Sequence, residues 1–452
     1  MIEVNTEEIK ETIRKYSTPF NNNYKDASII LAAGHGKRIK SNTSKMLHKI
    51  WEVPTVNRVV NACLKGIPES NVIVVVGIKA EDVTKSVGKN SEISFAYQEV
   101  QHGTGHAVQV ALENIPESFD GTVYVFPGDM GLLDDKTVKF FKDSFEESKS
   151  DMMVLTGIYE GAKDENHYGR IIRVKEKDAK GVKSKYKGKV IEIMEFKDIL
   201  KLDNKKPYLT KYKKKSFKFT RTELLENMEF NSGVYAFKSK PLFELIKKLQ
   251  NNNAQGEIYI TDLIALFNEH NYNVEAVSPA DQYVLMGFNN KSVLKEMDSI
   301  AKKLVYEKIK DIVLIDDPED FFIAEDVVEN LLKRDLSGEI LDIEIGKGVY
   351  VGAGVSLASK IKLMKNVKVE GKVSISENVI VDSNSQIIGS DEYPCVLESG
   401  VVLKGMNYII GSRIGKNSLI MHSILANKKI SEGSEIKFVN PETKGEEFIL
   451  NL

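Results

Sequence analysis

A glycine-rich stretch followed by basic residues is the first feature of the sequence that could do chemistry. Ser28–Ala33 is a short apolar run, typical of a buried strand, and it leads into Gly34-His-Gly36. Glycines let the backbone turn tightly and present N–H groups to an anion. Arg38 follows closely, and Lys45 lies a little further along. The stretch therefore suits a polyphosphate, although it matches neither the P-loop nor the Gly-x-Gly-x-x-Gly pattern, and an ordinary strand-to-helix turn is the alternative.

Asp129 is the second residue that could do chemistry. It comes directly after a run with the pattern of a buried strand, Thr122–Phe126, and the pair Pro127-Gly128. Mg²⁺ prefers oxygen ligands, keeps several waters and bridges substrate phosphates. The carboxylate could hold such an ion. It could equally cap the helix that is expected to follow.

A third group of polar residues lies between Tyr97 and His106. The amide of Gln98 offers both a donor and an acceptor, which suits the imide edge of uracil or thymine. Gly103 would let the backbone approach a base closely, at a turn that starts a helix. His102 and His106 are four residues apart, but glycines lie between them and a third ligand is missing. We therefore expect no metal at these histidines.

The elements that must position these residues alternate along the chain from Ser28 to about Asn290. Strand-like runs are separated by helical patterns at 56–64, 105–112 and 136–148. This alternation predicts an α/β domain with a doubly wound, mostly parallel, Rossmann-like sheet. Ligands bind at the carboxyl ends of the strands in such sheets, where both Gly34 and Asp129 are expected.

The last part of the sequence carries a repeat of six residues. Aliphatic residues recur at this period from Ile345 to Ile387, and a second column with the same period starts at Ile343. Neither a helix nor a strand has this period, which is typical of a left-handed parallel β-helix. The register slips at 389–395 and resumes loosely, and we expect about four to five coils.

Composition sets limits on partners and location. The chain of 452 residues is 42% hydrophobic and 28% charged, with a net charge of −2 and two cysteines far apart. No run approaches 18 apolar residues, and the start of the chain has no secretory pattern. We expect a cytoplasmic protein with neither a membrane nor a nucleic acid as its partner.

Residues 31–38, together with Lys45-Met-Leu-His48, resemble the signature of the sugar-1-phosphate nucleotidyltransferases. The similarity is most specific to the uridyltransferase part of the bifunctional N-acetylglucosamine-1-phosphate uridyltransferases. Residues 251–262, Asn-Asn-Asn-Ala-Gln-Gly-Glu-Ile-Tyr-Ile-Thr-Asp, are its most distinctive match. The similarity covers residues 26–330 closely and the β-helix in type only. It implies UTP and a sugar-1-phosphate, N-acetylglucosamine-1-phosphate, as substrates, pyrophosphate as a product, and Mg²⁺ as the cofactor.

The resemblance also implies a role for individual residues. Arg38 and Lys45 would be the catalytic cations, and Asp129 and Asn289 the ligands of Mg²⁺. Nucleotide contacts are implied for Leu31, Ala32, Ala33, Gly34, Gln98, Gly103 and Thr104. Sugar contacts are implied for Pro127, Gly128, Gly169, Glu195, Asn231, Tyr259 and Thr261. The chain departs from the family at Gly131, where proline is usual.

We divide the chain into four parts on these grounds. They are an N-terminal extension at 1–25, a nucleotidyltransferase domain at 26–290, a linker region with an amphipathic helix at 291–340, and the β-helix at 341–452. In related acyltransferases such coils form trimers. The resemblance thus implies a homo-oligomer, for which a trimer is one form.

Acetyl transfer by the β-helix is not expected. In the family this activity requires many more coils and a catalytic histidine within them, whereas His422 is the only histidine of this domain and lies near its end.

Three other hypotheses are open. A related enzyme could use another sugar-1-phosphate or dTTP, because Gln98 suits thymine equally well. A non-catalytic homologue could be regulatory, although the presence of Arg38, Lys45 and Asp129 argues against that. Finally, the lysine-rich stretch 203–221 contains aromatic residues and could bind single-stranded nucleic acid, but we expect a solvated insertion loop there.

Overall fold

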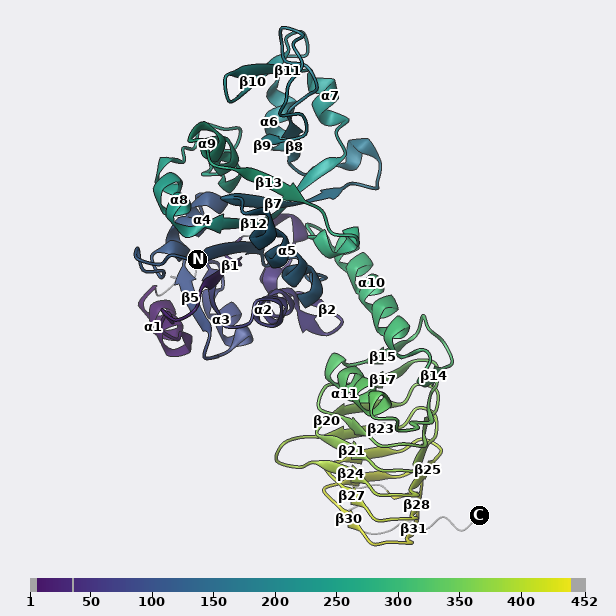
Figure 1. The fold of residues 1–452 in the computed structure, drawn as a ribbon. Coiled ribbons are helices and arrows are strands. Elements are labelled where there is room, and N and C mark those ends of the chain that lie inside the picture. The colour runs from purple at the N-terminus through teal and green to yellow at the C-terminus, as the bar shows by residue number, and fades with distance from the viewer. Residues whose placement is uncertain (1–5, 35, 440–452) are drawn as a thin grey trace. The chain divides into compact units, whose positions relative to one another are not determined.

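The structure is a computed structural model that describes residues 6–34 and 36–439 (Figure 1). Three parts of the chain lie outside the described residues: 1–5 in the predicted N-terminal extension, His35 in the glycine-rich stretch, and 440–452 in the predicted β-helix domain. The chain divides into two units, with the division between Met297 and Asp298, and each is described by itself.

A nine-stranded sheet forms the centre of the first unit, and its main strand order is β13-β7-β12-β6-β1-β4-β5. Four neighbouring strands are parallel, as expected: β6 (Thr122–Pro127), β1 (Asp26–Leu31), β4 (Ser70–Val76) and β5 (Ile93–Tyr97). The long strand β12 (Glu229–Lys238) runs antiparallel to β6 and to β7 (Met152–Ile158), and β7 pairs in parallel with β13 (Val274–Val277). The antiparallel pair β8 (Arg170–Arg173) and β9 (Val190–Met194) joins the sheet through β12. The predicted Rossmann-like fold class is thereby confirmed.

Two hydrophobic cores, one on each face of the sheet, explain why its central strands are continuously apolar. Adjacent side chains of a strand point to opposite faces, so Ile30 packs in one core and Ile29 in the other. One core is covered by α2 (Thr55–Gly66), α3 (Ala80–Val87) and α5 (Asp135–Ser148). The other is covered by α4 (Thr104–Leu112), α8 (Ser239–Leu245) and α9 (Leu263–Glu269) (Figure 1).

The N-terminal extension packs on the free edge of this sheet. Helix α1 (Thr6–Tyr16) buries Ile9 in the first core, and Thr12 Oγ1 donates to Glu81 Oε1 at 3.0 Å. Beyond the helix, the Ser17 hydroxyl accepts a hydrogen bond from the backbone N–H of Phe95, at 3.0 Å, and Thr18 N–H donates to Ile93 O at 2.8 Å. Because β5 is an edge strand, these contacts satisfy backbone groups that would otherwise be open to another strand.

The lysine-rich stretch is a β-hairpin, so the expectation of a solvated loop was wrong. Strands β10 (Tyr208–Tyr212) and β11 (Lys215–Phe219) are antiparallel, and they lie near α6 (Phe196–Lys201) and α7 (Arg221–Leu225) (Figure 1). Tyr212, Phe217 and Phe219 are buried in a small separate core with Ile172, Val174, Ile191, Ile199 and Leu224. Buried rings cannot stack on nucleobases, which weakens the nucleic-acid hypothesis.

The second unit is a parallel β-helix, as the six-residue repeat predicted. The long helix α10 (Lys291–Ile309) leads into it, and α11 (Glu325–Leu336) follows the strands β14 (Val313–Ile315) and β15 (Phe321–Ile323). Three parallel sheets contain seven, six and five strands, so the described residues include five complete coils. Residues 18 apart face each other at Ile343 and Ile361, and their side chains stack inside the coil.

The predicted slip in register is also present. Strand β23 ends at Gly389 and β24 begins at Cys395, with an outward loop between them. Leu403, Ile409, Ile414 and Ile420 then continue the buried column. The strands from the first to the last coil are β16 (Ile343–Ile345), β17 (Val349–Val351), β18 (Ser356–Leu357), β19 (Ile361–Leu363), β20 (Lys368–Gly371), β21 (Val373–Ile375), β22 (Ile380–Val381), β23 (Gln386–Gly389), β24 (Cys395–Leu397), β25 (Val402–Lys404), β26 (Tyr408–Ile410), β27 (Arg413–Ile414), β28 (Leu419–Met421), β29 (Ile424–Ala426), β30 (Lys429–Ile430) and β31 (Glu435–Lys437).

No helix among the described residues is both long enough and apolar enough to cross a membrane.

Candidate active site

The carboxyl ends of β1 and β6 bring the glycine-rich stretch next to Asp129. In the parallel register, Leu31 at the end of β1 faces Pro127 at the end of β6. The backbone continues this contact, because Gly128 N–H donates to Leu31 O at 3.0 Å. On the other side of β1, Ala32 N–H donates to Val75 O at 2.9 Å. Both predicted motifs therefore share one edge of the sheet.

A cavity of about 230 Å³ opens at this edge, and its lining residues are Gly34, Gly36, Arg38, Lys45, Met46 and Asn289. Gly36 has a φ of +56°, and a Cβ there would lie 2.7 Å from Lys45 Cβ, so the turn requires glycine. A Cβ at Gly34 would meet no atom within 4 Å, so the backbone at this position is open to a ligand. The cavity thus combines exposed backbone with two cations, as a polyphosphate site requires.

Lys45 links the two residues that were predicted to hold a metal. Its ammonium Nζ donates to the carboxylate of Asp129 and, at 3.1 Å, to Asn289 Oδ1. The Lys45 and Asp129 side chains are only 11% and 18% exposed. The ring of Phe288 lies 5.3 Å from the ammonium. Asn289 is far from Lys45 in the sequence. It reaches the site because its neighbour Gly287 packs against Asp129. A Cβ at Gly287 would lie 3.3 Å from the Asp129 carboxylate.

Asp129 and Asn289 are chemically suited to Mg²⁺. Their oxygen atoms converge on a positive charge, the ammonium of Lys45, which shows that the arrangement favours a cation. The described residues contain no cluster of three His, Cys, Asp or Glu side chains that could hold a metal alone. Two protein oxygens, completed by water and substrate phosphates, form the kind of site that Mg²⁺ accepts.

The alternative role of Asp129 as a helix cap does not hold. The cap of α5 is Asp134, whose side chain accepts a hydrogen bond from Thr137 N–H at 2.8 Å.

The residues predicted to contact the base lie around the start of α4. Gln98 is 3% exposed, and its Nε2 lies 3.2 Å from Gly103 O. Gly103 has a φ of +109°, and a Cβ there would lie 2.6 Å from Ile258 O, so no other residue fits. Thr104 Oγ1 accepts a hydrogen bond from Ile260 N–H at 3.2 Å. These contacts bring the distinctive segment 251–262 against the loop that is predicted to contact the base.

Three of the residues predicted to contact the sugar also come together. Asn231 N–H donates to Gly169 O at 2.9 Å, and a Cβ at Gly169 would lie 3.0 Å from Glu195 Oε1. Asn231 Oδ1 accepts a hydrogen bond from Gly233 N–H at 3.0 Å. Gly233, with a φ of +85°, packs against Pro127, which connects this group to the end of β6.

Tyr259 and Thr261 follow in the same segment that contacts Thr104. The hydroxyl of Tyr259 accepts a hydrogen bond from Gln255 Nε2 at 2.8 Å, and burial raises the pKa of this tyrosine to about 12. Thr261 is buried, and its hydroxyl has no partner among the described residues. A buried hydroxyl without a partner is costly, so it is a candidate contact for a ligand.

Burial shifts the acidity of the carboxylates in this region. Desolvation, and then the charges of Asp198 and Asp262, raise the pKa of Glu195 to about 7. Desolvation and Asp198 raise the pKa of Asp262 to about 6. Both groups thus titrate near neutral pH, which is typical of functional sites.

Arg170 and Asn166 are two residues of this region to which the sequence analysis assigned no role. Arg170 is fully buried, and its guanidinium donates to Asn166 Oδ1 at 2.8 Å and to Asn166 O at 2.7 Å. It fixes the turn that contains Tyr168 and Gly169. Tyr168 lies near Asp129 and Gly287; desolvation first, and then the charge of Asp129, raise its pKa. The position of Arg170 directly after Gly169 was the available signal.

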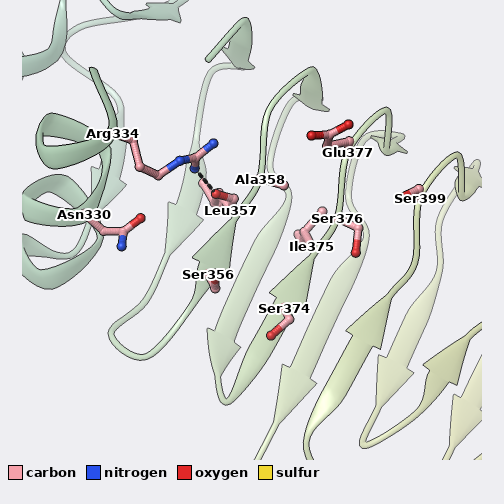
Figure 2. A pocket seen from close by; sticks show the side chains of 10 residues that line it. All are labelled: Asn330, Arg334, Ser356, Leu357, Ala358, Ser374, Ile375, Ser376, Glu377 and Ser399. Atoms are coloured by element: carbon pink, nitrogen blue, oxygen red, sulfur yellow. Dashed lines mark hydrogen bonds between the residues drawn. The ribbon is translucent and has the colours of Figure 1, made fainter. Parts of the chain in front are cut away.

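A second, larger hollow of about 540 Å³ lies in the β-helix, between α11 and the strands β18 and β21 (Figure 2). Small residues such as Ser356, Ser374 and Ser376 line it. Its arginine, Arg334, is already engaged, because it pairs with Glu339 and donates to Leu357 O and to Ser359 Oγ. We assign no chemistry to this hollow.

The sheet and the glycine-lined cavity at its edge are those expected of a nucleotide-binding α/β domain, and comparisons with known proteins specify the family. Residues 27–283, more than half of the chain, match the model of the nucleotidyl transferase family. The bifunctional protein GlmU of Clostridium tetani is 34% identical over 304 residues, which are 67% of this chain and 58% of that protein. GlmU of Clostridium novyi is 33% identical over 416 residues, 91% of this chain and 75% of that protein.

The chain therefore belongs to the nucleotidyl transferase family. It spans 58% and 57% of the length of the GlmU proteins of Clostridium tetani and Clostridium botulinum.

Proposed function

We propose that the protein transfers UMP from UTP to N-acetylglucosamine-1-phosphate, which yields UDP-N-acetylglucosamine and pyrophosphate. The observation that carries this proposal is the meeting of Lys45, Asp129 and Asn289 beside a glycine-lined cavity. The shared family and the similarity to GlmU proteins support it.

No covalent intermediate is needed for this reaction. A phosphate oxygen of the sugar phosphate would attack the α-phosphorus of UTP in line, and the bond to the β-phosphate would break. Pyrophosphate would leave with the electron pair. Catalysis then consists of positioning the two anions and stabilising their charge.

Arg38 and Lys45 would stabilise that charge. Both line the cavity, and the ammonium of Lys45 contacts the two side chains proposed to hold the metal. Asp129 and Asn289 would hold Mg²⁺, which neutralises phosphate charge when it is bound.

The sugar would be held by the group around Glu195. An ionised Glu195 would accept hydrogen bonds from sugar hydroxyls. Gly169 lies beside Glu195, and the backbone N–H of Asn231 donates to Gly169 O. Leu31 to Gly34, Gln98, Gly103 and Thr104 would contact the nucleotide, at the same carboxyl edge of the sheet.

The β-helix would serve assembly into a homo-oligomer, or regulation, and not acetyl transfer. The five complete coils among its described residues stack aliphatic side chains inside.

A screen of sugar-1-phosphates against nucleoside triphosphates, with pyrophosphate release as the signal, tests the function. We expect the highest kcat/KM for UTP with N-acetylglucosamine-1-phosphate. A preference for dTTP or for another sugar-1-phosphate would replace the proposed substrates. Absence of release with every pair would favour a regulatory homologue.

A further inference from the structure

The amide of Gln98 is buried and held in one orientation. Its Nε2 lies 3.2 Å from Gly103 O and 3.0 Å from Nδ1 of His106. A backbone carbonyl oxygen can only accept hydrogen bonds, so the group that faces it must be the NH₂ end of the amide. The second hydrogen of that NH₂ group then points to His106.

The other end of the amide is left free. Within the part of the chain that the structure describes, Oε1 of Gln98 accepts no hydrogen bond, and the N–H of Gly103 donates none. One acceptor and one donor thus remain together at the start of α4. The imide edge of uracil or thymine offers the complement, because its N3–H donates and its carbonyl oxygens accept.

His106 can hold this orientation only as a neutral ring with its proton on Nε2, because Nδ1 must accept. Burial, and then the neighbouring charge of His102, lower the pKa of His106. The rings of His102 and His106 are 5.1 Å apart.

We propose that His106 is a positioning residue for base selection. By accepting from Nε2 of Gln98, it keeps Oε1 directed at the N3–H of the pyrimidine and thereby disfavours cytosine, whose N3 is an acceptor. This inference rests on the proposed use of UTP, since it concerns the same nucleotide site.

Two substitutions separate an orienting role from a merely structural one. His106→Leu fills a similar volume but removes the acceptor, whereas His106→Asn keeps an oxygen acceptor near the position of Nδ1. His102→Leu is the matched control, because the His102 side chain is exposed. The readout is the equilibrium dissociation constant of UTP and of CTP in the presence of Mg²⁺, with a thermal melt of each variant.

We expect the wild type to bind UTP more tightly than CTP. His106→Leu should lower this preference by about fivefold, the worth of one buried hydrogen bond. His106→Asn should retain most of the preference. His102→Leu should also retain most of it, because burial, and not the charge of His102, is the main cause of the lowered pKa of His106.

Other outcomes overturn the inference. Equal binding of UTP and CTP by the wild type would do so, as would a His106→Leu variant that weakens both nucleotides by the same factor. An Asn variant that behaves like the Leu variant would also contradict it. If UTP is preferred but N-acetylglucosamine-1-phosphate is not consumed, the proposed function fails while the role of His106 stands.

Discussion

At the scale of single residues, the position of Lys45 is the most informative feature of the site. Its ammonium lies between the carboxylate of Asp129 and the amide oxygen of Asn289, where a metal ion is expected to be held. A lysine in that place balances the charge of the partly buried carboxylate. Mg²⁺ held by Asp129 and Asn289, as proposed, would compete with Lys45 for the same oxygen atoms.

Substitution of Lys45 separates these two effects. Lys45→Ala should lower kcat by 100-fold or more, on the order expected when a charge-stabilising group is lost. It should also tighten Mg²⁺ binding to the free protein, because the competing ammonium is gone. Steady-state kinetics and a calorimetric Mg²⁺ titration measure the two effects. A weaker affinity for Mg²⁺ in the variant would contradict the competition.

The raised pKa of Glu195 predicts that binding of the sugar phosphate depends on pH. Its pKa of about 7 lies above the usual 4.5, because burial and the nearby carboxylates disfavour the charged form. The ionised acceptor is therefore present above pH 7 and is lost as the pH falls below it. We expect the KM for the sugar phosphate to rise about tenfold from pH 8 to pH 6.

Glu195→Gln is the control for this profile. The variant cannot titrate at this position, so its KM should change with pH only as the substrate itself titrates. Identical profiles for the wild type and Glu195→Gln would exclude Glu195 as the group responsible.

At the scale of elements, the hairpin β10–β11 forms a two-stranded sheet of its own, separate from the central sheet. Its inward side chains, including Phe217, close a small core that also contains residues of β8, β9 and α6. Glu195 lies between β9 and α6. The hairpin therefore supports the strand end that carries Glu195, the carboxylate proposed to bind the sugar.

Removal of a buried ring should loosen this part of the fold. Phe217 is fully buried, so Phe217→Ala should cost about 3 to 5 kcal/mol in the free energy of unfolding. The exposed neighbour Lys218 provides the control. Lys218→Ala should change the free energy of unfolding by no more than about 0.5 kcal/mol. Limited trypsin digestion and the KM for the sugar phosphate report the effect. Equal resistance to trypsin in Phe217→Ala and in the wild type, which have the same lysines, would show that the hairpin core is not needed.

The elements also show what a sequence can and cannot predict. The β-helix was predictable because Ile343 and its successors repeat at a fixed period, and the period alone defines the coil. The hairpin was not predicted, because its lysines are more conspicuous than the alternation of Tyr212, Phe217 and Phe219. The packing of the N-terminal helix through Ile9 could not be predicted from the sequence either, because a single buried residue produces no periodic pattern.

For the site, the strand ends predicted that the glycine-rich stretch and Asp129 would be neighbours. The contact of Lys45 with Asn289 depends on packing between segments 244 residues apart, which periodicity does not reveal. Asn289 was predicted only through the resemblance to a family. Arg170 was assigned no role, because it fixes a turn and its residue type alone does not reveal that.

At the scale of the whole molecule, the second unit raises the question of a second activity. His422 is the only histidine of the β-helix, and its ring stacks on Phe438 with centroids 5.6 Å apart. We expect no acetylation of glucosamine-1-phosphate with acetyl-CoA. Release of coenzyme A, followed with a thiol reagent, measures this with little background, because Cys63 and Cys395 are both buried. Release that depends on glucosamine-1-phosphate would contradict the expectation.

The central claim is that Asp129 and the cations beside it form one Mg²⁺-dependent site for nucleotidyl transfer. The most direct test is pyrophosphate release from UTP and N-acetylglucosamine-1-phosphate by the wild type and by Asp129→Ala, with and without Mg²⁺. Pyrophosphate release by the wild type should require Mg²⁺. Asp129→Ala should release no pyrophosphate, although its thermal melt shows a folded protein. Undiminished release by Asp129→Ala would contradict the account.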